Sequence, residues 1–242
     1  MPEPAIPQAP IQTRQTHAQT AMNMLRSLIM GIVWFSIPFL SAGTLHWVRG
    51  WIFASIYVPV MAALGMAVHH WNPGLMTARL KWRNKDTKRF DKVFTAIHLP
   101  LAFLLPGIAG LDAVRFRWSA MPGWTLPLGI ILFLLGTALM GWALAVNPWA
   151  ESTVRIQLDR GHSVVRNGPY RFVRHPMYVG ALAMYPAMAC MLGSRWALAL
   201  AGVTMVLFIW RTANEDSVLR RELPGYEAYA AVTRYRLLPG IW

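Results

Sequence analysis

The chain has 242 residues, of which 55% are hydrophobic and 14% are charged, and its mean hydropathy is +0.36. This balance excludes a disordered chain and disfavours an ordinary soluble globule. The formal net charge of +13 at pH 7 raises the question of nucleic-acid binding, which the distribution of lysine and arginine answers.

Six apolar runs without Asp, Glu, Lys or Arg follow one another along the chain. Crossing the hydrocarbon core takes about 20 helical residues, so we interpret each run as a membrane span. The predicted spans cover residues 25–45, 51–70, 93–111, 124–146, 177–193 and 196–212. The last two are short and are separated by Gly193, Ser194 and Arg195, which predicts a helical hairpin. The sequence therefore predicts an all-α integral membrane protein with five to six transmembrane helices.

The basic residues are distributed unequally between the two sides of the membrane. With a cytoplasmic N-terminus and six crossings, 19 lysines and arginines lie inside and four lie outside: Arg49, Arg115, Arg117 and Arg195. The positive-inside rule accounts for this split without a polyanion, so we expect membrane lipid and no nucleic acid as partner. Both termini are predicted to be cytoplasmic, and the alanine- and arginine-rich composition favours a bacterial inner membrane.

Three regions follow from this pattern. Residues 1–23 contain four prolines and little periodicity, and we expect a flexible cytoplasmic tail without a cleaved signal peptide. Residues 24–146 are predicted to form a four-helix transmembrane region with a cationic loop at 71–92. Residues 147–242 combine a polar stretch, the hairpin and a cytoplasmic amphipathic C-terminal helix, which Pro224 and Gly225 interrupt.

Polar chemistry concentrates in residues 147–176, which are far more than the two to eight residues that a helix connection needs. If the hairpin returns the chain to the same side, residues 168–178 (GPYRFVRHPMY) meet Arg211, Glu215 and Asp216. Cationic, carboxylate, imidazole and aromatic groups over an apolar cleft suit S-adenosylmethionine, whose carboxylate, ammonium and adenine they can bind. The same residue types also suit a nicotinamide nucleotide.

The spacing Arg174-His175-Pro176-x-Tyr178-x-Gly180, followed after the hairpin by Glu215-Asp216, resembles the isoprenylcysteine carboxyl methyltransferase family. The similarity is greatest to bacterial members, and the family is related to the integral-membrane phospholipid N-methyltransferases. The family pattern has a Glu-Glu pair where this chain has Glu215-Asp216, so both charges are kept and one side chain is shorter. The resemblance covers residues 147–242.

The resemblance implies S-adenosylmethionine as cofactor. The loop and the C-terminal segment would bind it, so residues 147–242 would form a cofactor-binding catalytic region without a Rossmann sheet. The implied cofactor-binding residues are Gly168, Pro169, Tyr170, Arg174, His175, Pro176, Tyr178, Gly180, Glu215 and Asp216. Because a sulfonium methyl is already activated, the protein mainly has to align it with the acceptor. The candidate catalytic residues are Arg211 or Arg171, to hold an anionic acceptor, and Glu215 (or His175) as base for a neutral one.

The implied acceptor is a lipophilic carboxylate or thiol, isoprenylcysteine-like, that arrives laterally from lipid. Alternatives are a phospholipid N-methyltransferase, a membrane NADPH-dependent reductase of sterol-reductase type with a similar C-terminal ending, and a non-catalytic lipid-binding or scaffold protein. In the last case the arginines of residues 166–174 anchor lipid headgroups, and Tyr226 and Tyr229 only pack. No metal site is predicted, since His69, His70 and His98 lack paired carboxylates. The sequence leaves the oligomeric state open.

Overall fold

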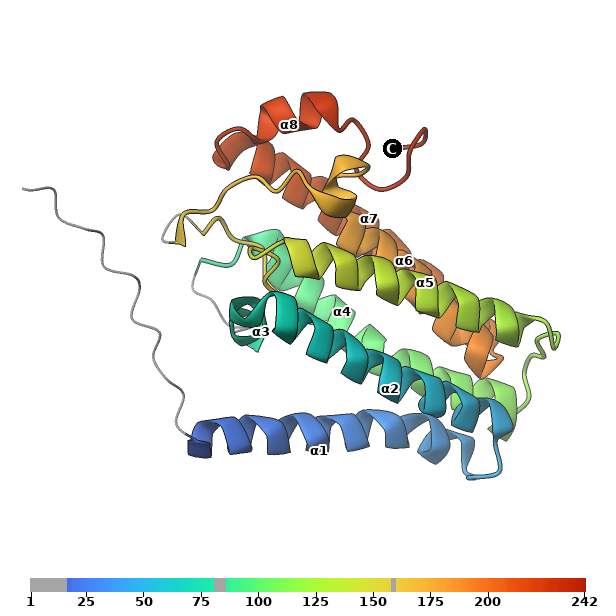
Figure 1. The fold of residues 1–242 in the computed structure, drawn as a ribbon. Coiled ribbons are helices and arrows are strands. Elements are labelled where there is room, and N and C mark those ends of the chain that lie inside the picture. Colours follow the sequence, from blue (N-terminus) through green and yellow to red (C-terminus); the bar gives the residue numbers. More distant parts are fainter. Residues whose placement is uncertain (1–16, 81–85, 158–159) are drawn as a thin grey trace, which may run out of the picture. The chain divides into compact units, whose positions relative to one another are not determined.

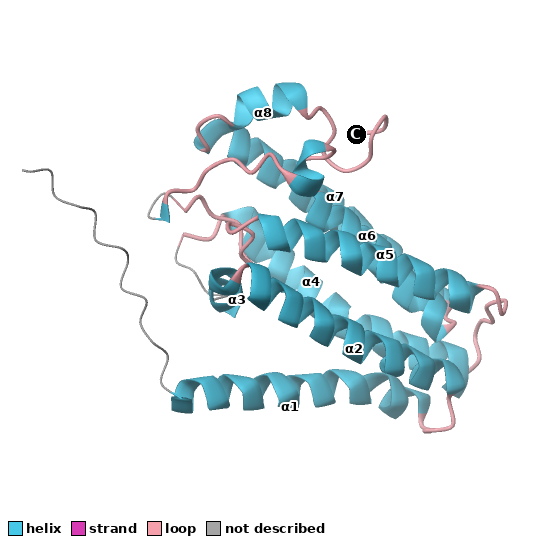
Figure 2. Ribbon diagram, viewed as in Figure 1, coloured by secondary structure: helices cyan, strands magenta, loops and turns pink. Residues whose placement is uncertain are grey.

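The computed structural model describes residues 17–80, 86–157 and 160–242. These residues form helices and loops, and no strand occurs among them (Figure 2). The elements in chain order are α1 (His17–Ala42), α2 (Val48–Trp71), α3 (Pro73–Leu80), α4 (Arg89–Gly110), the π-helix η1 (Leu111–Arg115), α5 (Thr125–Val146), the 3-10 helix η3 (Gly168–Arg171), α6 (Pro176–Leu192), α7 (Arg195–Glu222) and α8 (Tyr226–Val232) (Figure 1). The predicted all-α class is confirmed.

The chain divides into two compact units, residues 1–36 and residues 37–242. In the first unit, α1 begins at His17 and continues through residue 36, so residues 17–23 of the predicted tail are helical. Residues 1–16 of that tail lie outside the described part of the chain, as do residues 81–85 of the predicted cationic loop. The functional residues discussed below all belong to the second unit.

Within the described residues, four helical segments are long and apolar enough to cross a membrane: Val48–Trp71, Arg89–Arg115, Thr125–Val146 and Arg195–Glu222. Each of the six predicted spans lies on a helix, and four of them agree with its bounds to within four residues; α1 begins eight residues before its predicted span, and α7 ends ten residues after its own. Two of those helices fall short, since α6 has 17 residues and rises only about 25 Å against a hydrocarbon core of about 30 Å. The apolar, described part of α1, Ile29–Ala42, is shorter still.

Helix α7 is longer than the span predicted at 196–212. It has 28 residues and rises about 42 Å, because no helix breaker occurs before Pro224. It ends at Glu222, and Gly225, at φ 81°, lets the chain turn into α8. The extra turns carry Glu215 and Asp216 on the same helix that forms the span and carries Arg211.

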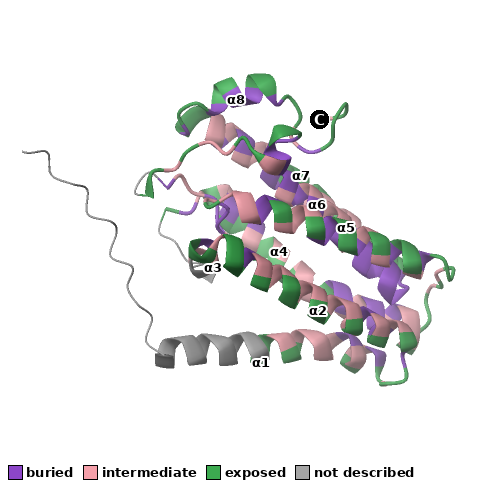
Figure 3. Cartoon of the chain, in the orientation of Figure 1, coloured by how far each residue is buried: buried purple, intermediate pink, exposed green. Residues whose placement is uncertain are grey.

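Helices α5 and α6 approach closely because glycines face each other between them. A Cβ on Gly136 would lie 2.8 Å from the Gly180 carbonyl oxygen, and one on Gly180 would lie 2.6 Å from the Gly136 carbonyl oxygen. Small residues of this kind allow helices in a membrane to pack backbone against backbone. Buried residues accordingly concentrate along α5, α6 and α7 (Figure 3).

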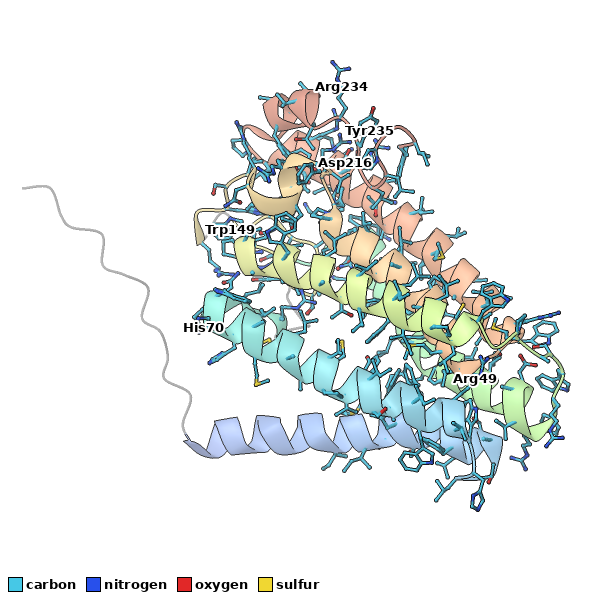
Figure 4. All side chains as sticks on the ribbon, turned by 45° about the vertical axis from the view of Figure 1, so that its right-hand side comes forward. Arg49, His70, Trp149, Asp216, Arg234 and Tyr235 are labelled. Atoms are coloured by element: carbon cyan, nitrogen blue, oxygen red, sulfur yellow. The ribbon has the colours of Figure 1, made fainter. Side chains whose placement is uncertain are left out.

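The two ends of this bundle differ in their chemistry. At one end, Arg49 donates to the carbonyl oxygens of Cys190 and Pro122 and to the Thr125 hydroxyl, which ties three helix ends together. Figure 4 shows Arg49 at that end and Trp149, Asp216 and the C-terminal segment at the other. We call the latter the site end, defined by residues 147–175 and 211–242.

Candidate functional site

One carboxylate, Asp216 on α7, organises the site end. Its side chain is fully buried, and Arg174 donates to both of its oxygens, with Nε–Oδ1 at 2.7 Å and Nη2–Oδ2 at 3.1 Å. The Nε2 atom of His175 lies 3.3 Å from Oδ1. The predicted proximity of the arginine-histidine cluster and the acidic pair is therefore confirmed.

The same carboxylate also holds the C-terminal segment. Tyr226 donates its hydroxyl to Oδ1 at 3.0 Å, and Arg220 and Arg236 donate to Oδ2 at 3.2 and 2.9 Å. Burial lowers the pKa of Arg174, but hydrogen bonding to Asp216 outweighs it, so the pKa of this guanidinium is raised and it stays charged. Asp216 is thus the point at which α6, α7, α8 and the C-terminus meet.

Backbone hydrogen bonds also hold the C-terminal segment of residues 226–236, which we call the clamp. The amides of Arg174 and His175 donate to the carbonyl oxygens of Tyr235 and Arg236, both at 2.9 Å. The Tyr229 hydroxyl donates to the Tyr170 carbonyl oxygen at 2.6 Å. Burial raises the pKa of Tyr229 to about 12, so this phenol is a neutral donor at physiological pH. Residues 226–236 therefore lie over the turn that begins α6.

The turn η3 is positioned by a glycine. Gly168 has φ 58°, and a Cβ there would lie 3.1 Å from Trp142 Nε1 and 3.1 Å from Val146 Cγ2. Only glycine adopts this conformation at so little cost and fits against α5. The Tyr170 hydroxyl then accepts from Asn147 Nδ2 at 2.8 Å, and burial raises the pKa of this phenol, so it remains protonated.

These elements surround a cavity at the site end, lined from residues 147–155, 162–165, 170–178 and 215–229. Its lining combines three kinds of side chain. The charged and imidazole groups are Glu151, Arg155, His162, Arg174, His175 and Glu215. The aromatic groups are Trp149, Tyr170, Tyr178, Tyr226 and Tyr229. A cavity that offers both carboxylates and cations beside aromatic rings suits a zwitterionic ligand that carries a flat ring system.

Glu215 faces this cavity from α7 and is hydrogen-bonded by the Tyr178 hydroxyl of α6. The two residues therefore connect the two arms of the helical hairpin directly beside the cavity. The Tyr178 ring also lies parallel to the His175 ring, with centroids 5.8 Å apart. The hydrogen bond from Tyr178 thereby restrains the orientation of the Glu215 carboxylate beside the cavity.

Residues 124–224 match the family model described as phospholipid methyltransferase, which the isoprenylcysteine carboxyl methyltransferases share. This part of the chain is similar to the phospholipid methyltransferase family. The match indicates a membrane methyltransferase. No curated protein matches the chain. The matched segment runs from α5 to the end of α7 and therefore contains η3, the α6–α7 hairpin and all three acidic or basic side chains, Arg174, Glu215 and Asp216, that organise the cavity.

Arg211, one turn before Glu215 on α7, is buried against a second acid. Its Nη2 lies 2.8 Å from Asp91 Oδ1 of α4 and donates to the Ser152 carbonyl oxygen at 3.1 Å. The guanidinium also lies 4.3 Å from the centroid of the Phe94 ring and 5.3 Å from that of Tyr178. Asp91 Oδ2 accepts from the Val154 amide at 2.7 Å, so this pair fastens the loop to α4.

The opposite wall of the cavity comes from residues 149–165. The Trp149 and His162 rings are stacked, with centroids 5.1 Å apart, and Glu151 pairs with Arg155 at 2.9 Å. Burial, followed by the charge of Arg155, lowers the pKa of His162 to about 4. Its Nδ1 is therefore unprotonated and accepts from the Gln157 amide at 3.3 Å.

The predicted site residues separate into two groups in the structure. Those that line the cavity are Tyr170, Arg174, His175, Tyr178 and Glu215. Those that lie behind or beside it are Gly168, Pro169, Arg171, Pro176, Gly180, Arg211 and Asp216. In the second group, Arg171 is exposed with its guanidinium over the Phe172 ring, and Gly180 is buried between α5 and α6.

Sequence reasoning missed Asp91 and Arg79, which reach the site end from α4 and α3. Asp91 pairs with Arg211, and Arg79 donates to the Ala150 carbonyl oxygen at 2.6 Å. A signal existed for Asp91, because a carboxylate in the first turn of an apolar helix that enters the membrane needs a partner. Arg79 stood among seven basic residues of the predicted cationic loop, which the positive-inside rule already explained.

An apolar groove runs between α2 and α5. It is lined from Val60 to Trp71 on α2 and from Leu134 to Val146 on α5, a length of about 18 Å along the helix. Thr137 lies in it with a buried hydroxyl that has no hydrogen-bond partner among the described residues. At its site end the groove stops at Val146, directly before Asn147, which lines the cavity.

Proposed function

We propose that the chain is an S-adenosylmethionine-dependent methyltransferase that methylates a lipophilic carboxylate or thiol, isoprenylcysteine-like, at the membrane. The observation that carries the proposal is the cavity at the site end, where Glu215, Tyr178 and Tyr170 face the same space inside a segment that matches a methyltransferase family. The distribution of lysine and arginine supports a cytoplasmic site end with both termini on that side, and the composition favours a bacterial inner membrane.

The residues present fit this cofactor chemically. Glu215 offers a carboxylate for ribose hydroxyls or an ammonium group, and Trp149 and the tyrosines offer faces for a purine. Bound S-adenosylmethionine supplies a methyl group on a sulfonium, which needs no further activation. Asp216 acts as a positioning residue, because all of its contacts in the described chain are to protein groups that build the wall.

The protein then has to align the acceptor with the methyl group and to exclude water from the cavity. The clamp of residues 226–236 closes the cavity from one side, and Met177, Leu219 and Leu223 contribute apolar lining. An anionic acceptor needs a cation to hold it, whereas a neutral acceptor needs a base. Glu215 and His175 are the groups placed to accept a proton in the cavity.

The α2–α5 groove supports a lipophilic acceptor. It opens along two membrane-spanning helices and is lined by aliphatic and indole side chains, so a single apolar chain can lie there while its polar end reaches Asn147. This arrangement favours an acceptor with an apolar tail and a small reactive head.

Two measurements test the proposal. Purified full-length protein in nanodiscs should bind S-adenosylhomocysteine in calorimetry, and absence of measurable affinity would contradict it. Membranes incubated with methyl-labelled S-adenosylmethionine should transfer label to an extractable lipophilic compound.

The family description favours one second candidate, phospholipid N-methylation. Alkaline hydrolysis releases the label of a methyl ester as methanol, whereas an S-methyl or N-methyl group retains it, so the compound that carries retained label must be identified. Label that stays with a phospholipid headgroup after hydrolysis would support the second candidate.

A further inference from the structure

Arg79 on α3 carries a guanidinium that pairs with no carboxylate among the described residues. Its Nη1 donates to the Ala150 carbonyl oxygen at 2.6 Å and lies 4.0 Å from Met177 Sδ. The Nε and Nη2 groups donate to nothing in the described chain. The neighbouring inward-facing arginines are all paired: Arg155 with Glu151, Arg174 with Asp216, and Arg211 with Asp91.

The position of Arg79 connects it to the cavity. Ala150 and Met177, which it contacts, both line the cavity, and the Tyr170 and Tyr178 phenols are close enough to influence its charge. Burial lowers the pKa of Arg79, and no carboxylate offsets that effect. A guanidinium nevertheless remains protonated at physiological pH, so a positive charge without a carboxylate partner among the described residues lies next to Ala150 and Met177, which line the cavity.

A partly buried cation without a carboxylate partner is unfavourable, and a planar fork with two unused nitrogen donors matches a carboxylate. We propose that Arg79 binds the carboxylate of a ligand in the cavity. The inference rests on the proposed function, which provides two sources for this group: the amino-acid end of the methyl donor and the acceptor. Arg174 is occupied by Asp216 and by the carbonyl oxygens of residues 233 and 234, so it has no free fork for that role.

A purely structural role for Arg79 makes a different prediction. The residue also ties α3 to the loop, since Ser152 Oγ donates to its carbonyl oxygen at 2.9 Å and its side chain holds Ala150. Loss of that tie would change stability and would weaken all ligands alike. Loss of a carboxylate partner would weaken only ligands that carry the carboxylate.

The experiment therefore compares matched ligand pairs on the full-length protein in nanodiscs. The donor pair is S-adenosylhomocysteine and 5′-methylthioadenosine, which lacks the amino-acid end. The acceptor pair is N-acetyl-S-farnesylcysteine and its methyl ester. Affinities are measured for the unmodified protein, Arg79→Gln, Arg79→Lys and the control Arg221→Gln, whose guanidinium is exposed on α7 and bonds Ser217 Oγ.

We expect Arg79→Gln to reduce the preference for the carboxylate-bearing member of one pair by about 10- to 100-fold, as for a charge-assisted hydrogen bond. The pair that responds identifies the source of the carboxylate. Arg79→Lys, which keeps the charge and loses the fork, should restore part of the preference. Arg221→Gln should leave both preferences unchanged.

If both preferences stay within about threefold in Arg79→Gln while S-adenosylhomocysteine still binds, the inference is wrong and the proposed function stands. If the unmodified protein binds no S-adenosylhomocysteine, the proposed function itself fails. Should Arg79→Gln not fold, Arg79→Lys provides the same comparison. In one of the two ligand pairs, the preference of Arg79→Lys for the carboxylate-bearing member must then be measurably lower than that of the unmodified protein. Unchanged preferences in both pairs overturn the inference.

Discussion

Arg174 and Asp216 face each other through two parallel N–H···O bonds, 2.7 and 3.1 Å long, although 42 positions separate them in the chain. Such a two-point pair fixes both the distance and the orientation of the groups. Because successive residues on a helix are rotated by about 100°, turning Asp216 inward directs the preceding Glu215 toward the cavity. The shorter acid therefore holds the surrounding segments together, and the longer one lines the cavity.

Asp216→Asn should destabilise the protein strongly. It leaves the Arg174 guanidinium buried and uncompensated, for which about 3–5 kcal/mol of unfolding free energy is a typical loss. Thermal unfolding in detergent micelles measures the change. Glu222→Gln is the control, because its pair with Lys88 is partly exposed and contributes at most about 1 kcal/mol. Equal effects of the two substitutions would contradict a central role for Asp216.

Hydropathy predicted the helices well, because hydrocarbon leaves the backbone few alternatives to a helix. The spacing of Arg174, His175 and Tyr178 with Glu215 and Asp216 also located the site end. The sequence did not indicate which member of the acidic pair lines the cavity, since that depends on the rotation of α7. That rotation is fixed by the contacts of Arg174, Tyr226 and Arg236, which come from three other segments.

Contacts between segments that are distant in the chain could not be predicted from the sequence either. Asp91 is 120 positions from Arg211, and the local sequence around either residue does not predict that the two residues pair. The end of α7 posed a related problem. A charge pattern marks where a chain leaves hydrocarbon, but a helix ends only where its residues or caps require it. Residues 213–222 contain no breaker, so the helix continues.

Glu215→Gln should reduce the affinity for S-adenosylhomocysteine by about tenfold or more while unfolding stays near that of the unmodified protein. The amide keeps the shape but loses the charge that strengthens hydrogen bonds to hydroxyl or ammonium groups. Calorimetry on the purified protein measures the affinity. Glu227→Gln, an exposed carboxylate paired with Arg220, should bind as the unmodified protein does. Unchanged affinity in Glu215→Gln would remove Glu215 from the proposed cofactor site.

The loop that carries His162 should lose stability in acid. The pKa of His162 is about 4 in the folded protein and near 6.5 in an unfolded chain, so the unfolded chain binds the proton first as the pH falls. The free energy of unfolding should therefore decrease between about pH 6.5 and pH 4, and this group adds nothing further below that range. Protonation of Nδ1 would also break the bond from the Gln157 amide.

His162→Gln separates this effect from other titrations, because glutamine retains an acceptor and does not titrate. Unfolding curves measured from pH 7.5 to pH 4 should fall more steeply for the unmodified protein than for the variant. Parallel curves would mean that His162 takes up its proton equally in both states.

Gly180→Ala should disrupt the contact between α5 and α6. The added methyl would lie 2.6 Å from the Gly136 carbonyl oxygen and 3.2 Å from the Met140 amide nitrogen, so the backbones must separate. Overpacking of this kind costs about 1–3 kcal/mol. Gly202→Ala on α7 is a matched control, since a Cβ there meets no atom within 4 Å. Alanine in that helix interior should be neutral or slightly stabilising. Because α6 begins at the cavity, separation of α5 and α6 should also weaken the binding of S-adenosylhomocysteine. A stable Gly180→Ala protein with full affinity would show that the site tolerates this displacement.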